Sequence, residues 1–202
     1  MTRSFSLTWD YRCPFARNAH EHVLTALAAG ADWEVRFVPF SLGQVHVGEG
    51  ETDVWDEPEK DTGIVALQAG TLVRDRDPER FPAVHRALFA ARHDHGLKLK
   101  EPDVVRDALE ANGVDSEEIF AAIDDGTALK QVRSEHEGAV ESWKVWGVPT
   151  FCSGDQGVFV RLMDRSPDGT DPDTSRRSID RIIDMLDGWP ELNEFKKTFI
   201  LR

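Results

Sequence analysis

Cysteine is scarce in this chain, which has only Cys13 and Cys152 among 202 residues. Two cysteines in a protein without export features are expected to be free thiols rather than a disulfide. A Cys-X-X-Cys pair is absent, because Ala16 stands three residues after Cys13. Several histidines cluster loosely in the middle of the chain, but no cysteine or ordered carboxylate set completes a metal site. We therefore expect no metal and no tightly bound cofactor.

Long apolar runs and positive charge are also lacking. No hydrophobic stretch approaches the roughly 20 residues that cross a bilayer, and residues 1–7 do not resemble a secretory signal. These absences predict a cytoplasmic protein with no membrane partner. The chain carries 37 acidic and 24 basic side chains, for a net charge of −13. This balance argues against binding to nucleic acid, which requires a basic surface. Neither a Gly-rich phosphate loop nor a Gly-x-Ser-x-Gly nucleophile turn is present.

The most informative stretch is residues 9–16, where a strand pattern ends and a helix pattern begins. Cys13 stands at that junction, and Pro14 follows it at a first-turn position where a missing N–H costs nothing. A cysteine at a helix start faces unpaired backbone N–H groups and the positive end of the helix dipole. Both favour the thiolate, so we predict a lowered pKa and a reactive thiol at Cys13.

The hydrophobic pattern predicts an α/β protein. Period-2 alternation indicates strands, whereas apolar positions three and four apart indicate helices. On this basis the chain opens as β-α-β, continues through an acidic loop into helices only, and returns to a hairpin and a last helix. The expected strands are residues 4–9, 33–38, 150–152 and 158–160, the first helix ends at Gly30, a long helix runs over about 127–146, and the last helix ends at Gly188.

This order, with Cys13-Pro14-Phe15 at the first strand–helix junction and Gly147-Val148-Pro149-Thr150 before the later hairpin, resembles the DsbA-like branch of the thioredoxin superfamily. The similarity is greatest to cytoplasmic DsbA-like proteins near the mycothiol-dependent reductases. It implies a discontinuous thioredoxin-like domain, residues 1–44 and 138–202, interrupted by a helical domain at 45–137.

The resemblance also implies roles for particular residues. The first active-site cysteine of the family is the attacking nucleophile, and that position is Cys13. The proline before the later strand is cis and packs beside the sulfur, and that position is Pro149. The residue before this proline, Val148, offers its backbone to a bound peptide or thiol. We include Pro14 and Thr150, which flank these positions, among the substrate-binding residues.

Ala16 departs from the family pattern, since the usual second cysteine stands there. Cys13 then has no partner one turn along the helix, and we expect monothiol chemistry in which a small thiol resolves a mixed disulfide. The small thiol would be mycothiol or glutathione, and the substrate a small-molecule or protein disulfide. Two alternatives stay open: a thiol-dependent isomerase or transferase of the kappa-class type, and a non-catalytic peptide- or thiol-binding module with an inert cysteine. The oligomeric state is not predicted.

The remaining candidate side chains have two interpretations each. Tyr11 and Phe15 form either an aromatic rim for substrate or ordinary packing. Arg12 either steadies a thiolate or binds a thiol's carboxylate, or else it is a solvated surface residue. Trp143 and Trp146 lie just before the proline turn, and they either line a groove beside Cys13 or serve core and interdomain packing. Cys152 is expected to be a small buried hydrophobe rather than a resolving cysteine.

Overall fold

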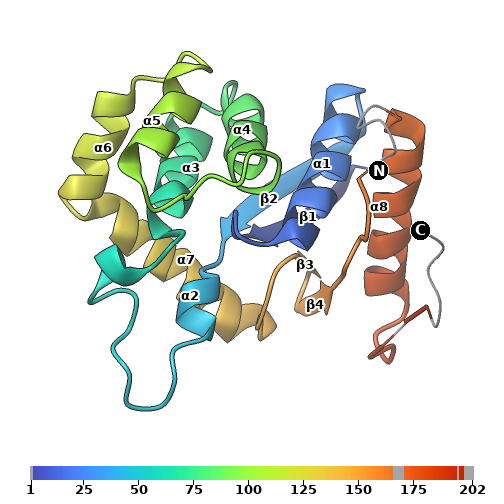
Figure 1. The fold of residues 1–202 in the computed structure, drawn as a ribbon. Coiled ribbons are helices and arrows are strands. Elements are labelled where there is room, and N and C mark those ends of the chain that lie inside the picture. Colours follow the sequence, from blue (N-terminus) through green and yellow to red (C-terminus); the bar gives the residue numbers. More distant parts are fainter. Residues whose placement is uncertain (1, 166–170, 195, 198–202) are drawn as a thin grey trace.

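The computed structural model describes residues 2–165, 171–194 and 196–197. Within them, a sheet flanked by helices carries a large helical segment on one side (Figure 1). This confirms the predicted α/β class with a helical insertion after β-α-β. The elements are β1 Arg3–Trp9, α1 Pro14–Ala28, β2 Trp33–Pro39, α2 Leu42–Val45, η1 (a 3₁₀ turn) Pro58–Lys60, α3 Ile64–Arg76, α4 Phe81–His93, α5 Pro102–Glu110, α6 Ser116–Asp124, α7 Thr127–Trp143, β3 Thr150–Ser153, β4 Gln156–Phe159 and α8 Pro172–Gly188.

The sheet brings the two ends of the chain together. Its strand order in the described residues is β2-β1-β3-β4, with β1 parallel to β2 and the β3–β4 hairpin antiparallel to β1. Leu7 at the centre of β1 pairs with Phe37 of β2 and Phe151 of β3. Because β3 pairs antiparallel with β1, the chain that leaves β1 starts beside the chain that enters β3. Helices α1 and α8 contact each other, and α8 also contacts β3 and β4 (Figure 1).

Helix α1 has well-defined ends that position its first residue. Cys13 is the N-cap, with an extended backbone, and Pro14 follows it in the first turn. At the other end Gly30 has φ +84°, a conformation that glycine adopts without steric cost. The N–H groups of Gly30 and Ala31 donate to the carbonyls of Leu27 and Ala26, which closes the helix in a Schellman pattern. Fixed ends hold Cys13 in a defined place relative to β1.

The helical segment contains α3 to α7, and none of its described residues forms a strand. The predicted domain limits, 44/45 and 137/138, fall inside α2 and α7. Helix α7 also ends earlier than predicted, at Trp143, because Lys144 adopts the left-handed conformation with φ 55°. The sequence predicts the end of this helix at Gly147, three residues beyond Lys144. As a result Trp146 stands outside the helix, in the turn that leads to Pro149.

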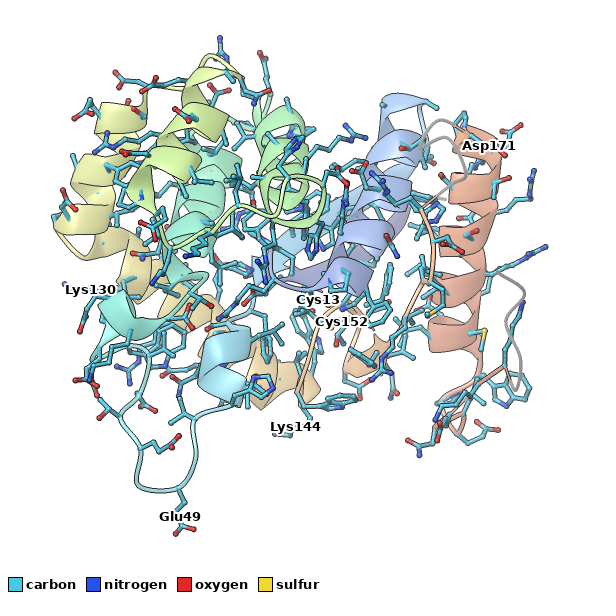
Figure 2. The ribbon with its side chains drawn as sticks, viewed as in Figure 1. Cys13, Glu49, Lys130, Lys144, Cys152 and Asp171 are labelled. Atoms are coloured by element: carbon cyan, nitrogen blue, oxygen red, sulfur yellow. The ribbon has the colours of Figure 1, made fainter. Side chains whose placement is uncertain are left out.

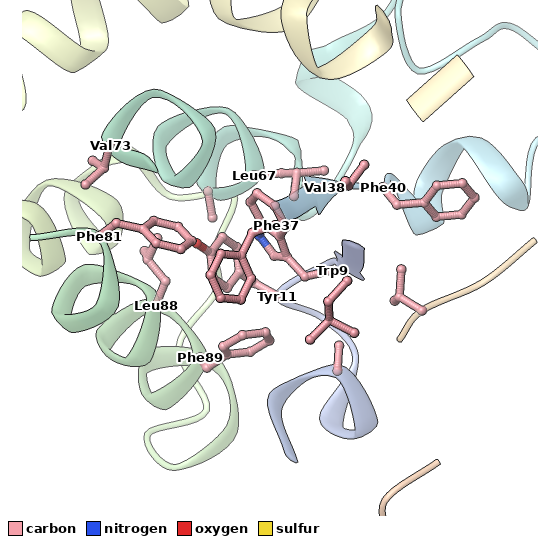
Figure 3. Close-up of a cluster of buried hydrophobic side chains, with 14 of the residues drawn as sticks. Trp9, Tyr11, Phe37, Val38, Phe40, Leu67, Val73, Phe81, Leu88 and Phe89 are labelled. Carbon is pink, nitrogen blue, oxygen red and sulfur yellow. The ribbon is translucent and has the colours of Figure 1, made fainter. Parts of the chain in front are cut away.

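A cluster of buried side chains joins the sheet to the helical segment (Figure 3). Aromatic rings from β1, from the turn after it and from β2 meet those of α4, as in the edge-on contact of Tyr11 with Phe89 at 4.8 Å between ring centroids. Each large apolar side chain buried in this way stabilises the fold by about 1.5–3 kcal/mol. The cluster includes Trp9, Tyr11, Phe37, Val38, Phe40, Leu67, Val73, Phe81, Leu88 and Phe89.

Candidate active site

Cys13 lies between the end of the inner strand β1 and the start of α1 (Figure 2). After Trp9 the chain makes a tight turn in which the Cys13 N–H donates to the carbonyl of Asp10 at 3.0 Å. The Sγ atom of Cys13 accepts a hydrogen bond from the Ala16 N–H at 3.4 Å. The sulfur therefore occupies the N-cap position that the sequence predicts for it.

The predicted counterpart of Cys13 is in contact with it. The Val148–Pro149 peptide bond is cis, and the Cys13 thiol donates to the carbonyl oxygen of Val148 at 3.2 Å, across 135 residues of sequence. The buried Thr150 stabilises this turn, because its hydroxyl donates to the Gly147 carbonyl at 2.7 Å. The Cys13 sulfur and the proline turn thus lie together, while Thr150 acts on the shape of the turn.

The pKa of Cys13 differs from the sequence prediction. Burial of the thiol, which is 8% exposed, raises its pKa, and this effect outweighs the backbone N–H groups of Ala16 and Phe15, which lower it. The negative charge of Asp10 raises the pKa further and the positive charge of Arg161 lowers it. The prediction of a lowered pKa is therefore wrong, because it counted the helix terminus and omitted desolvation.

Alkylation measures this shift. In a Cys152→Ala protein, the rate of reaction of Cys13 with iodoacetamide will rise with pH and reach half its plateau above about 8.5, the value for an ordinary cysteine thiol. A raised pKa means that less thiolate is present at pH 7 than in a free thiol, so the rate at pH 7 will also fall below that of a free thiol. N-acetylcysteine amide is the matched reference, and a midpoint below its own would contradict the assignment.

Arg12 is committed to two carboxylates. Its guanidinium pairs with Asp10 at 2.6 Å and with Asp61 at 2.8 Å, and both carboxylates are buried. Asp10 in turn accepts from the Leu42 N–H at 2.8 Å. Neither interpretation of Arg12 holds: it is not a solvated arginine, and its guanidinium is directed to Asp10 and Asp61. It fixes the turn before Cys13 to the start of the helical segment.

Tyr11 is fully buried, so of its two interpretations ordinary packing holds and the aromatic rim does not. Its hydroxyl lies 2.8 Å from His85 Nδ1, His85 Nε2 lies 2.9 Å from His20 Nδ1, and His20 Nε2 lies 3.2 Å from the carbonyl oxygen of Thr8. We call these four residues the histidine chain. Burial lowers the pKa of His20 to about 3 and that of His85 well below its usual value, so both rings are neutral.

A neutral histidine ring has one N–H donor and one acceptor nitrogen, so the hydrogen bonds of the histidine chain all run in the same direction. A carbonyl oxygen only accepts, so His20 donates from Nε2 and accepts at Nδ1. His85 then donates from Nε2 and accepts at Nδ1, and Tyr11 donates its O–H. Sequence reasoning missed this chain, because it unites a strand, a turn and two helices that only the tertiary structure brings together.

A partly exposed group of side chains lies close to the cysteine. Trp146 is 63% exposed and packs on Phe159, with ring centroids 4.5 Å apart. The guanidinium of Arg161 lies over the rings of Phe159 and Phe15, at 5.3 and 5.5 Å from their centroids. We call Phe15, Trp146, Phe159 and Arg161 the aromatic–arginine patch. Phe15 and Trp146 were candidates from sequence, whereas Phe159 and Arg161 were missed; Pro14, also exposed, lies beside Cys13.

Cys152 takes no part in this site. It is 1% exposed, in the middle of β3, and burial raises the pKa of its thiol to about 12. Both cysteines are free, which agrees with the sequence prediction. In the described part of the chain, no cluster of histidine, cysteine and carboxylate side chains could hold a metal ion, and no helix there is long and apolar enough to cross a membrane.

The sequence matches a known protein family and a mycobacterial protein. The family model described as DSBA-like thioredoxin domain matches residues 7–177. The uncharacterised protein Rv2286c of Mycobacterium tuberculosis is 29% identical over 164 residues, which are 80% of this chain and 69% of that protein.

Solved structures share the fold at low identity. Oxidised BdbD from Bacillus subtilis matches with a TM-score of 0.60 at 16% identity, over 88% of this chain and 85% of that chain. A 2-hydroxychromene-2-carboxylate isomerase matches with a TM-score of 0.61 at 16% identity, over 90% of this chain and 97% of that chain. The chain thus shares its fold with both of these proteins.

Proposed function

The chain belongs to the family of DSBA-like thioredoxin domains, and we propose that it is a thiol–disulfide oxidoreductase that works through Cys13 alone, with a low-molecular-weight thiol as co-substrate. Family membership supports thiol–disulfide exchange as the reaction class. The single observation that carries the monothiol form is the pairing of the Cys13 thiol with the Val148 carbonyl at 3.2 Å, while Ala16 occupies the place of a second cysteine.

The proposed reaction has two exchanges. Cys13 loses its proton to solvent, and the thiolate attacks one sulfur of a disulfide RS–SR′. The Cys13–SR bond forms, the S–S bond breaks, and R′S⁻ leaves with the electron pair. A small thiolate R″S⁻ then attacks the R sulfur of the mixed disulfide, forming R″S–SR and returning Cys13 as thiolate. In sum, one thiol and one disulfide are converted into another thiol and another disulfide.

The raised pKa of Cys13 bears on the direction of this reaction. Strongly oxidising sites depend on a low-pKa cysteine, whose thiolate stabilises the reduced state. Cys13 lacks that stabilisation, because it is buried and its proton is bonded to Val148. At the same time a thiolate of higher pKa is the stronger nucleophile once formed. We infer that the site reduces disulfides at the expense of a small thiol rather than oxidising proteins.

Turnover tests the proposal. Wild-type protein incubated with 2-hydroxyethyl disulfide will gain one mercaptoethanol adduct by intact mass, and added glutathione or mycothiol will remove it and sustain catalytic reduction. The rate with the cognate thiol will exceed that of the uncatalysed exchange. An adduct that no small thiol resolves would support a binding module. Thiol binding without any adduct would support the isomerase or transferase class, to which one structural neighbour belongs.

A further inference from the structure

The aromatic–arginine patch has a fixed position beside the proposed reaction centre. The segment that carries Arg161 is tied down on both sides: the Val160 N–H donates to the Pro149 carbonyl at 3.1 Å, and the Leu162 carbonyl accepts from the Asn18 amide of α1 at 2.8 Å. One tie holds the segment to the proline turn and the other to the helix of Cys13. Arg161 therefore lies between the proline turn and α1.

The guanidinium of Arg161 is available to a ligand. The residue is exposed, and among the described residues no carboxylate lies within ion-pair distance of it. Its neighbour in the same segment, Arg165, is 3.9 Å from Asp94. Arg161 is held instead over the rings of Phe15 and Phe159, which orient the guanidinium without neutralising it. Its charge reaches the cysteine, since it lowers the pKa of Cys13 against the effect of burial.

The chain carries a net charge of −13, which repels anions, so an anionic ligand needs a local cation such as Arg161 to bind here. A guanidinium forms two parallel hydrogen bonds to a carboxylate and is well suited to recognise it. The exposed ring of Trp146 extends the apolar surface next to the proline turn. A ligand that bears an aliphatic thiol and a carboxylate can thus contact the sulfur, the rings and the guanidinium together.

The geometry points to Arg161 as the residue that selects a carboxylate-bearing small disulfide or thiol, with Phe15, Phe159 and Trp146 supporting its aliphatic part. This assignment rests on the proposed function, and it names the substrate class: anionic, carboxylate-containing thiols in preference to neutral ones. The reaction itself is unchanged, and Arg161 is a specificity residue that binds the substrate remote from the sulfurs.

A matched pair of probes tests the assignment. The rates at which Cys13 forms mixed disulfides with 3,3′-dithiodipropionate and with its neutral diamide are measured by intact mass, and each is divided by the rate of the same probe with 2-mercaptoethanol. In the wild type the normalised rate will be higher for the diacid. Arg161→Gln will reduce the diacid-to-diamide ratio about fivefold, the effect of one partly exposed ion pair, and Arg161→Lys will restore part of it. Because the charge of Arg161 also acts on the Cys13 thiol, Arg161→Gln slows both probes, and the ratio removes this shared effect.

Arg165→Gln is the control, since it removes the same charge from the same segment and will leave the ratio unchanged. Equal ratios in wild type and Arg161→Gln would overturn the assignment and leave the proposed function standing. An equal fall in Arg165→Gln would overturn it too, because the preference would then reflect overall charge. If Cys13 formed no adduct with either probe, the proposed function itself would fail.

Discussion

The Cys13→Ser protein will form no mixed disulfide with any small disulfide and will show no turnover. A serine hydroxyl does not exchange with an S–S bond, so the loss is complete rather than partial. The fold will persist, because serine is among the preferred N-cap residues and its oxygen can accept the Ala16 N–H that now bonds to sulfur. Intact mass after incubation with 2-hydroxyethyl disulfide, with circular dichroism as a check of folding, measures both effects.

Cys152→Ala is the matched control for this result. Cys152 is buried in β3 with a thiol pKa of about 12, so its removal will leave the adduct and the turnover intact. It will cost some stability, since a small cavity replaces the sulfur. An adduct that survives in Cys13→Ser, or that disappears in a folded Cys152→Ala protein, would place the nucleophile elsewhere than at Cys13.

The Ala16→Cys protein will gain an internal disulfide between positions 13 and 16 and, with it, dithiol reductase activity toward insulin. The Ala16 backbone nitrogen already lies 3.4 Å from the Cys13 sulfur, since Cys13 is the N-cap and Ala16 belongs to the first turn of α1. Side chains three apart on a helix are neighbours, within reach of an S–S bond. Under oxidised glutathione, intact mass will show the loss of two hydrogen atoms without an adduct.

Ala19→Cys serves as the control for that gain. Ala19 is as buried as Ala16 and lies on the same helix, but a further turn away from Cys13. It will introduce a thiol at similar cost to packing without an internal disulfide or insulin reduction. If the thiols at positions 13 and 16 of a folded Ala16→Cys protein both stayed free under oxidising conditions, the arrangement of Cys13 at the start of α1 would be incorrect.

The sequence was sufficient for those parts of the site that depend on local order. Alternation in β1 and the Cys13-Pro14 junction locate the start of α1, and the Val148-Pro149 pair, found by resemblance, meets the sulfur as expected. The end of α1 was predicted because the left-handed residue that closes it is a glycine, Gly30. The end of α7 was missed because Lys144, a residue with no such preference, takes that conformation.

Properties that depend on distant contacts were not predictable. The sign of the pKa shift at Cys13 is set by desolvation, which requires knowledge of what covers the thiol. Arg12 was open to two interpretations because Asp61, one of its partners, lies 49 residues away in sequence. Arg161 was missed for a related reason: the hairpin was predicted, but not which side chain near its end would face α1.

The histidine chain has a consequence for how the two parts of the protein dock. His20 belongs to α1 and His85 to α4, and each donor in the chain has a single acceptor. A buried donor left without its acceptor costs about 1–3 kcal/mol. All these hydrogen bonds form together only in one position and one orientation of α4 relative to α1. Other packings of the two helices with similar apolar contact would break some of the bonds and are disfavoured. Tyr11 is the last member of the histidine chain and stands two residues before Cys13. The hydrogen bonds that select the position of the helical segment therefore also fix the backbone that carries the Cys13 sulfur.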